Sequence, residues 1–371
     1  MVGGGAGAFI GAVHRMAARL DDAWELAAGA FQSDPAASRA FGLALGLQEE
    51  RCYPSYETMA QAEARREDRI DAVAICAPNH VHARAARAFL ESGVPVICDK
   101  PLAISREEAE ALHELVRATG LPFILTHNYS GYPMVREARQ LVGSGALGAI
   151  RVVQAEYAQD WLSAPLEDNK QAQWRGDPSR AGPGGALGDI ATHAFHLCEF
   201  ITGLTTREVS AELTTFVPGR RLDDNAQILL RYEDGARGSI WASQVAVGAA
   251  NGLRIRIFGD RAALDWSQET PEELKFSPLG EASRIFRRGA EGLSSAAMRA
   301  TRLPAGHPEG YLEGFAQIYT DAAELVRAHM ERRPPDALAT LAPSIRDGVR
   351  GVRFIHASVA SSRESSQWTR V

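Results

Sequence analysis

Lysine is nearly missing from this chain of 371 residues: 37 of its 40 basic residues are arginine, and the lysines are Lys100, Lys170 and Lys275. A preference for arginine codons explains most of this bias. Arginine keeps its proton under all ordinary conditions, whereas a buried lysine can exchange one. A lysine at a strand end is therefore a candidate for a site that needs an amine.

The sequence also lacks the features of several protein classes. A formal net charge of −6 argues against nucleic acid or an anionic membrane as the main partner. The chain has no run of eighteen apolar residues, and its N-terminus lacks the pattern of a secretory signal. Four cysteines, at positions 52, 76, 98 and 198, show neither CxxC nor Cys/His metal spacing. We expect a cytoplasmic protein with reduced, mostly structural cysteines and no metal site.

The first 127 residues alternate short apolar runs with amphipathic helices, which is the pattern of βαβ units on a parallel sheet. Strands are predicted at 24–31, 72–77, 94–98 and 123–126. Ser105, with Glu108 three residues later, predicts the start of the clearest helix. Because only Met1 and Val2 precede the first glycine, we expect the first strand to be truncated and the native start to lie upstream.

The pattern changes near residue 150, where strands follow one another with few crossover helices. These strands are predicted at 150–161, 209–216, 226–232, 236–245, 253–258 and 273–276, with a hairpin turn at Asp234-Gly235 and long helices at 133–143, 185–201, 309–330 and 344–361. The segment 280–305 is predicted to be a mobile loop. The sequence therefore predicts an α/β protein with domains at 1–127 and 128–371, the second with a mostly antiparallel sheet and a last helix that packs back on the first.

A glycine turn opens the chain. Gly3-Gly4-Gly5-Ala6-Gly7-Ala8 fits G-x-G-x-x-A, a pattern that lets the backbone approach a pyrophosphate at a helix N-terminus, and Gly11 offers a further close-packing position. We expect cofactor contacts at Gly3, Gly5, Ala8, Phe9 and Ile10. Gln32 and Ser33 stand where an acidic residue that favours NAD is usual, Asp34 comes late, and Arg39 can serve a 2′-phosphate. The choice between NAD and NADP stays open.

Two further segments carry candidate chemistry. Lys100 follows the carboxyl end of a predicted parallel strand, the edge at which ligands bind in open α/β sheets. Asp189 and His193 are four residues apart on a predicted helix, so both side chains project from one face. A carboxylate and an imidazole together can hold a substrate hydroxyl and exchange its proton. His196 lies on an adjoining face and is interpreted as structural.

The order of these motifs resembles the Gfo/Idh/MocA oxidoreductases over almost the whole chain. The resemblance rests on the glycine turn, Ala77-Pro78-Asn79-His80-Val81-His82, Asp99-Lys100-Pro101, Trp174-Arg175, and Gly-Gly-x-x-x-Asp-x-x-x-His at 184–193. Asp99 stands where the family usually has glutamate, and the glycine turn is longer than the common form. The resemblance implies an N-terminal Rossmann domain that binds NAD or NADP and a C-terminal α/β domain whose open sheet often forms the interface of a homodimer or homotetramer.

The resemblance also implies roles for individual residues. Lys100, Asp189 and His193 match the family's active-site lysine and Asp/His pair. Cofactor contacts are implied for Pro78, Asn79, His82, Asp99, Lys100, Asn128, Trp174 and Arg175, and substrate contacts are suggested for Tyr129, Trp161 and His307. In the mechanism so implied, a carbinol of a sugar or cyclitol gives hydride to the nicotinamide while His193 takes the hydroxyl proton. Lys100 as the proton acceptor is the rival assignment.

Two alternatives to a sugar or cyclitol dehydrogenase stay open at this point. The first is oxidation of a non-sugar diol, such as an aromatic dihydrodiol, and the second is a non-catalytic regulator that binds NAD or NADP. The presence of Lys100, Asp189 and His193 together favours the enzyme. The sequence leaves open which ring is the substrate and in which direction the reaction runs.

Overall fold

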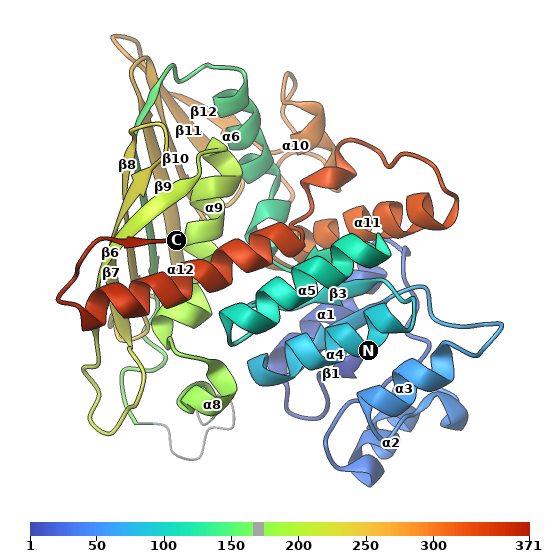
Figure 1. Ribbon diagram of the computed structural model, residues 1–371. Coiled ribbons are helices and arrows are strands. Elements are labelled where there is room, and N and C mark those ends of the chain that lie inside the picture. Colours follow the sequence, from blue (N-terminus) through green and yellow to red (C-terminus); the bar gives the residue numbers. More distant parts are fainter. Residues whose placement is uncertain (166–173) are drawn as a thin grey trace. The chain divides into compact units, whose positions relative to one another are not determined.

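The computed structural model describes residues 1–165 and 174–371, which divide into two compact units (Figure 1). Unit 1 consists of Met1–His127 and Phe315–Val349, and unit 2 consists of Asn128–Gly314 and Arg350–Val371. The segment Phe315–Val349, which the sequence analysis placed in the second domain, thus belongs to unit 1. The chain passes from one unit to the other within two helices, α11 (Tyr311–Met330) and α12 (Ile345–Arg363).

Unit 1 contains the predicted parallel sheet. Its elements are β1 (Val2–Gly3), α1 (Phe9–Leu20), α2 (Pro35–Ala44), η1 (Glu49–Arg51), α3 (Tyr56–Glu63), β2 (Val73–Cys76), α4 (Asn79–Glu91), β3 (Val96–Cys98), α5 (Arg106–Thr119), β4 (Phe123–Leu125) and η4 (Ala339–Leu341). The strands pair in parallel in the order β1-β2-β3-β4. Ser105 caps α5 as predicted, because its hydroxyl accepts the Glu108 N–H at 3.2 Å. The fold is a Rossmann domain.

The strand predicted at 24–31 is wrong over most of its length. Only Gly29 and Ala30 pair, through isolated parallel bridges to Cys52 and Val2. Trp24 donates its indole N–H to the Tyr319 carbonyl at 2.9 Å. The apolar start of this segment is therefore used for packing within unit 1 rather than for strand pairing.

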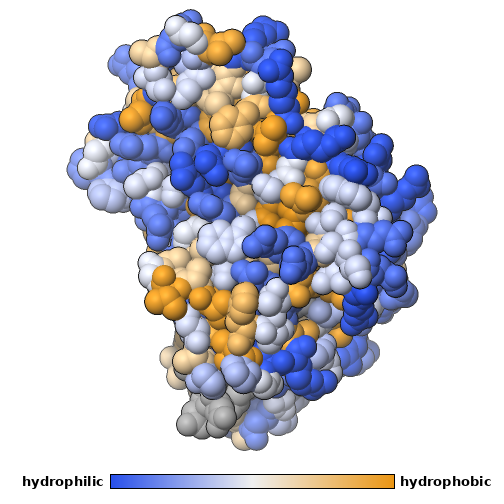
Figure 2. Space-filling model, turned by 90° about the vertical axis from the view of Figure 1, so that its left-hand side faces the viewer, coloured by the Kyte–Doolittle hydropathy of each residue, from blue (hydrophilic) through white to orange (hydrophobic). Residues whose placement is uncertain are grey.

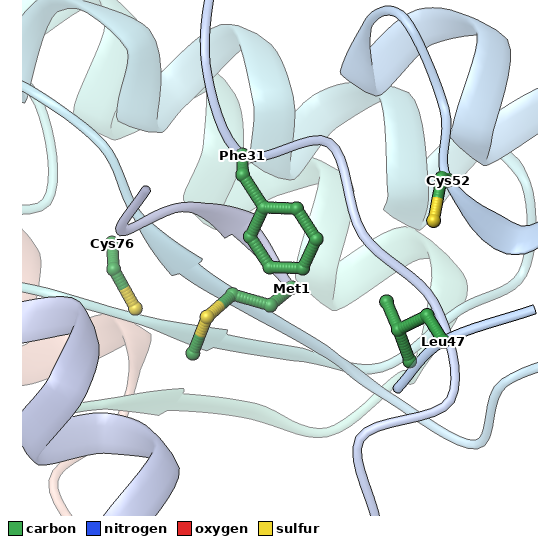
Figure 3. Close-up of a cluster of buried hydrophobic side chains, with 5 residues drawn as sticks. All are labelled: Met1, Phe31, Leu47, Cys52 and Cys76. Atoms are coloured by element: carbon green, nitrogen blue, oxygen red, sulfur yellow. The ribbon is translucent and has the colours of Figure 1, made fainter. Parts of the chain in front are cut away.

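A buried cluster lies beside the glycine turn (Figure 3). Its side chains are Met1, Phe31, Leu47, Cys52 and Cys76, and none is more than 9% exposed. Burial raises the pKa of the Cys76 thiol well above its usual range, so this cysteine behaves as a small apolar residue. All four cysteines of the chain are buried and unpaired with one another.

Unit 2 is built on a nine-stranded sheet. Its elements are η2 (Asn128–Gly131), α6 (Pro133–Gly143), β5 (Ile150–Ala158), α8 (Pro178–Ala181), η3 (Leu187–Ala191), α9 (Thr192–Thr202), β6 (Thr206–Thr214), β7 (Asn225–Tyr232), β8 (Arg237–Ser243), β9 (Gly252–Gly259), β10 (Ala262–Ser267), β11 (Glu273–Pro278), β12 (Arg284–Arg287), α10 (Ser295–Arg299) and β13 (Thr369–Arg370). The strand order is β12-β11-β10-β9-β5-β8-β7-β6-β13. Only β5 and β8 pair in parallel among these described strands, so the sheet is mostly antiparallel as predicted. The hairpin turn between β7 and β8 places Gly235 at φ +86°.

The two faces of this sheet differ. Helices α6 and α9 pack against one face (Figure 1). The other face carries Leu229, 54% exposed, and Trp241 and Phe258, each 37% exposed. A hollow of about 520 Å³ lies there, lined by Leu229 and Trp241 together with Glu156, Arg254 and others. Figure 2 views the side on which β6, β7 and β8 lie in Figure 1, and hydrophobic patches alternate there with hydrophilic groups.

The segment 280–305 is structured, contrary to the mobile loop predicted from its composition. It contains β12, which pairs with β11, and α10, whose first turn is capped by the Ser294 hydroxyl. Arg288, 3% exposed, pairs with Glu272 at 2.7 Å and with Glu309 at 2.9 Å. Arg288 and its two carboxylate partners hold this stretch in one arrangement, although few of its residues are large and apolar. Across the described residues, helices are too short or too polar to cross a bilayer.

Candidate active site

The glycine turn connects β1 to α1 in unit 1. Gly3, Gly4 and Gly7 adopt φ values of +75°, +70° and +76°, in the region that side chains disfavour. A Cβ atom on Gly11 would lie 2.3 Å from the Gly4 Cα. The helix and the turn therefore approach each other more closely than a side chain at residue 11 allows. Gly11, the additional glycine of this long turn, therefore allows the close contact between α1 and Gly4.

The N-terminus of α1 suits an anion. Its cap residue, Ala8, provides no side-chain hydrogen bond, and the first turn has no acidic residue. By contrast, side chains cap α2, α3 and α5. Because the first amide groups and the dipole of a helix attract phosphate, this end fits the pyrophosphate of a dinucleotide. The predicted contacts Phe9, 66% exposed, and Ile10 lie in the first turn of the same helix.

The segment after Phe31 offers polar groups near this turn. A Cβ atom on Gly5 would lie 2.5 Å from the Gln32 Cγ, so Gln32 packs on the turn. Ser33 is exposed. Asp34 is used as the cap of α2, where it accepts the Ala37 N–H at 2.7 Å. Arg39 forms a surface ion pair with Glu49, which directs its guanidinium to a partner within unit 1.

Lys100 lies at the carboxyl end of β3, as predicted. The Asp99 Oδ1 accepts the Lys100 backbone N–H at 2.8 Å and the Thr126 hydroxyl at 3.0 Å. The His82 ring lies between two carbonyl oxygens, with its Nδ1 2.7 Å from Pro101 and its Nε2 2.8 Å from Ala77. Asp99 and His82 therefore hold the backbone on either side of Lys100. The neighbouring helix α4 begins at Asn79, after Pro78, without a side-chain cap.

In unit 2, Asp189 lies in the π-helical turn η3, which runs into α9, and α9 carries His193. The predicted single helix 185–201 is therefore two segments of different pitch. Single π-helical turns are rare in proteins, and those that occur are often found at functional sites. Asp223 anchors the start of the turn, because its carboxylate accepts the Gly185 N–H at 2.6 Å and the Leu187 N–H at 2.8 Å. Burial raises the pKa of Asp223 to about 6, and the backbone N–H donors oppose this rise.

Among the described residues, Arg175 and Gln244 donate side-chain hydrogen bonds to the Asp189 carboxylate. Its Oδ2 accepts from the Arg175 Nε at 3.2 Å and from the Gln244 Nε2 at 2.9 Å. The Arg175 guanidinium lies 4.4 Å from the centre of the Trp174 ring. Gln244 is 2% exposed. Neither Gln244 nor Asp223 was singled out from the sequence, where each reads as an ordinary polar residue at a strand end.

Aromatic rings surround His193, which is 8% exposed. Tyr129 packs edge to face against it, with ring centres 5.0 Å apart, and the Tyr157 ring centre lies at 6.2 Å. The two phenol oxygens are 2.5 Å apart. Burial raises the pKa of both phenols, so both keep their protons at neutral pH.

The structure brings most of the predicted unit 2 residues together, and it places His307 in an exposed loop. Trp161 lies 5.9 Å from the Arg175 guanidinium, ring centre to Cζ. Asn128 is buried directly before Tyr129 in η2. His307 is exposed, and its Nδ1 lies 3.3 Å from the Pro304 carbonyl in its own loop. Within the described residues, no cluster of three or more His, Cys, Asp or Glu side chains is arranged to hold a metal ion.

Comparison with known proteins adds to this geometry. Residues 1–127 match the model of an oxidoreductase family with an NAD-binding Rossmann fold, and residues 135–265 match the model of the GFO/IDH/MocA C-terminal domain. An uncharacterized oxidoreductase of Bacillus subtilis (strain 168), YfiI, is 37% identical over 99% of this chain and 95% of its own length. The levoglucosan dehydrogenase of Pseudarthrobacter phenanthrenivorans is 29% identical over 81% of this chain and 80% of its own.

A solved structure is similar over the full length. The inositol dehydrogenase homolog from Azotobacter vinelandii, in complex with NAD+, has a TM-score of 0.95 and 39% identity, and the alignment covers 100% of this chain and 96% of that one. Its complex with NADH and myo-inositol has a TM-score of 0.92, 37% identity and the same coverage. With both domain models matched in order along a Rossmann unit and a mostly antiparallel-sheet unit, the chain belongs to the Gfo/Idh/MocA family of oxidoreductases.

Proposed function

We propose that this protein oxidises a secondary hydroxyl group on a polyhydroxylated ring, an inositol or a pyranose-type sugar, with NAD as the oxidant. The observation that carries the proposal is that His193, packed against Tyr129, follows four residues after Asp189, which Arg175 and Gln244 hold. It is an imidazole and a carboxylate set among phenol, indole and amide groups, which suits a ring with several hydroxyl groups. The family and the sugar and cyclitol dehydrogenases among the relatives support the same chemistry.

When bound, NAD would supply the acceptor for the hydride. The glycine turn, the N-terminus of α1 and the Asn79 end of α4 are the residues that would hold it. His193 takes the proton of the reacting hydroxyl, and Lys100 donates a hydrogen bond to the same oxygen to stabilise developing negative charge. Asp189 accepts from the neighbouring hydroxyl or orients His193. Proton transfer to Lys100 is the alternative assignment.

The test is reduction of NAD, followed by absorbance, with a panel of inositols, pyranosides and one aromatic dihydrodiol. General acid–base catalysis contributes roughly 10²–10⁴-fold, so His193→Gln should lower kcat by about that factor while NAD binding is retained. His196→Gln is the matched control, since His196 is a buried imidazole on the same helix that stacks on Phe200 instead. Turnover that survives in His193→Gln would remove the histidine role. Tight NAD binding without turnover of any substrate would favour the alternative that the protein is a non-catalytic regulator.

A further inference from the structure

A chain of hydrogen bonds runs through unit 2 beside His193. The Trp161 Nε1 lies 3.1 Å from the Gln159 Oε1, and the Gln159 Nε2 lies 2.7 Å from the Asn251 Oδ1. The Tyr157 hydroxyl lies 2.8 Å from the same Asn251 Oδ1, and the Tyr129 hydroxyl lies 2.5 Å from that of Tyr157. Five side chains are therefore linked in series, from an indole near Arg175 to a phenol against the His193 ring.

The indole at one end determines the donor and the acceptor of every hydrogen bond in this series. An indole N–H can only donate, whereas an amide has one end that donates and one that accepts. The Gln159 atom that faces Trp161 must therefore be the oxygen, and its nitrogen must face Asn251. The Asn251 atom that receives this N–H must in turn be its oxygen. Both amide orientations follow from a single donor-only group.

The phenols are then determined as well. Because the Asn251 oxygen can only accept, Tyr157 must donate its O–H to it. Tyr157 has one proton, so Tyr129 must donate its own O–H to the Tyr157 oxygen. Both phenols hold their protons at neutral pH, as their burial requires. Tyr129 thus donates its hydroxyl proton to a partner within the protein. Its oxygen can therefore only accept a further hydrogen bond.

We propose that Trp161 is a specificity-determining residue, because it sets Tyr129 as a hydrogen-bond acceptor that takes a donor hydroxyl of the substrate. The inference rests on the proposed function and deepens it by naming the substrate chemistry at one ring position. A hydroxyl donates to Tyr129 there. A group that can only accept a hydrogen bond, such as a phosphate, a carboxylate or an ether oxygen, would face the lone pairs of the Tyr129 oxygen. Two acceptors repel each other, so such a group is rejected.

The test compares ring polyols with their deoxyfluoro analogues, in which each hydroxyl in turn is replaced by a fluorine that cannot donate. The full-length protein loaded with NADH is titrated with each ligand, and kcat/KM is measured with NAD. At the ring position that faces Tyr129, the natural protein should prefer hydroxyl over fluorine by about 10- to 100-fold. Tyr129→Phe should reduce that preference to near one.

Two variants separate the effect of hydrogen-bond direction from the effect of an added negative charge. In Gln159→Glu, the carboxylate still accepts from Trp161 but cannot donate to Asn251. Asn251 must therefore turn its amide nitrogen toward this carboxylate and toward the Tyr157 hydroxyl. Tyr157 then donates to Tyr129, the Tyr129 proton is released toward the ligand, and the hydroxyl preference should disappear or invert. Asn251→Asp adds the same negative charge but can only accept, which leaves the natural direction in place. It should keep the preference for hydroxyl.

Loss of the indole donor is the third arm. Trp161→Phe keeps an aromatic ring but frees Gln159 to turn either way, so the preference should fall without inverting. Trp24→Phe is the matched control, because Trp24 donates its N–H to a carbonyl of unit 1. The inference is overturned if polyols bind and Gln159→Glu and Asn251→Asp give the same hydroxyl-to-fluorine ratio. If no polyol binds at all, the proposed function fails and this inference fails with it.

Discussion

The side-chain amide of Gln244 donates from 2.9 Å to the same Asp189 oxygen that accepts from Arg175. The backbone of Gln244 is fixed too, since its N–H donates to the Asp224 carbonyl at 2.9 Å and its own carbonyl accepts the Leu162 N–H at 3.1 Å. A buried amide with three fixed partners is a rigid support for a carboxylate. Gln244 is therefore a positioning residue for Asp189, and its substitution should affect activity through that carboxylate.

We expect Gln244→Leu to lower kcat/KM by about 10- to 100-fold, because one hydrogen bond to a charged group contributes about 1.5–3 kcal/mol. Gln244→Glu should place a second carboxylate beside Asp189 and raise the pKa of the Asp189 carboxyl by repulsion. The acid limb of the kcat/KM profile should then move to higher pH. A profile that keeps its acid limb while kcat/KM falls would indicate a purely structural role.

The π-helical turn allows a paired glycine test. A Cβ atom on Gly185 would lie 2.0 Å from the Asp223 carbonyl oxygen, whereas a Cβ atom on Gly188 would meet nothing within 4 Å. Gly185→Ala must displace the turn that carries Asp189, so kcat should fall at least 10-fold. Gly188→Ala, three residues along the same segment, should retain near-natural activity. Equal kinetics in the two variants would contradict the importance of this anchor.

His14 should give unit 1 a pH-dependent stability. Burial lowers the pKa of His14 to about 4 in the folded protein, where its Nδ1 lies 2.7 Å from the Tyr319 hydroxyl. The unfolded chain takes up this proton near pH 6.5. Stability is therefore complete above about pH 6.5 and falls as the pH drops toward 4, by up to about 3 kcal/mol. His14→Gln lacks this group, so its Tm deficit relative to the natural protein should narrow between pH 7 and pH 4. A constant deficit would count against the buried neutral histidine.

Arg39 offers a test of cofactor choice. Its guanidinium pairs with Glu49 on the surface of unit 1. Glu49→Gln should release this cation toward a 2′-phosphate and raise kcat/KM with NADP several-fold, with little change for NAD. The readout is the ratio of the two kcat/KM values. An unchanged ratio would place Arg39 outside the adenosine end of the site.

The open face of the nine-stranded sheet is expected to be the homo-oligomer interface, as the family resemblance implies. Leu229→Arg places a charge at one of its most exposed large apolar residues, 54% exposed, and should shift the protein toward smaller species in sedimentation velocity. Leu43→Arg, at a residue 42% exposed on α2 of unit 1, is the control. Identical sedimentation of both variants and the natural protein would exclude this face.

The sequence predicted the parallel sheet and the main antiparallel strands, because apolar runs and turn residues are local signals. It did not predict β10, in which buried and half-buried residues alternate over only six positions, from Ala262 to Ser267. The ordered segment around Arg288 was also missed, because ion pairs formed with Glu272 and Glu309 leave no periodic pattern.

For the candidate site, residue types and motif order pointed to Asp189, His193, Tyr129 and Trp161. What the sequence could not reveal is the network that holds them. Gln244 is 55 residues away from Asp189 along the chain, and Asn251 is 94 residues from Tyr157. Partners at such separations come together only through the pairing of β5, β8 and β9. The π turn is equally invisible, since its residues have the spacing of an ordinary helix.

The division of α11 and α12 between the two units has a consequence for synthesis. Unit 1 contains Phe315–Val349, so its last segment leaves the ribosome after nearly all of unit 2 has been made. The parallel sheet of Met1–His127 must wait for that segment to complete its core, and unit 2 in turn needs Arg350–Val371. Neither unit can finish folding as an early, independent N-terminal piece. A chain that stops shortly before residue 315 should accumulate as an aggregation-prone intermediate rather than as a stable Rossmann domain.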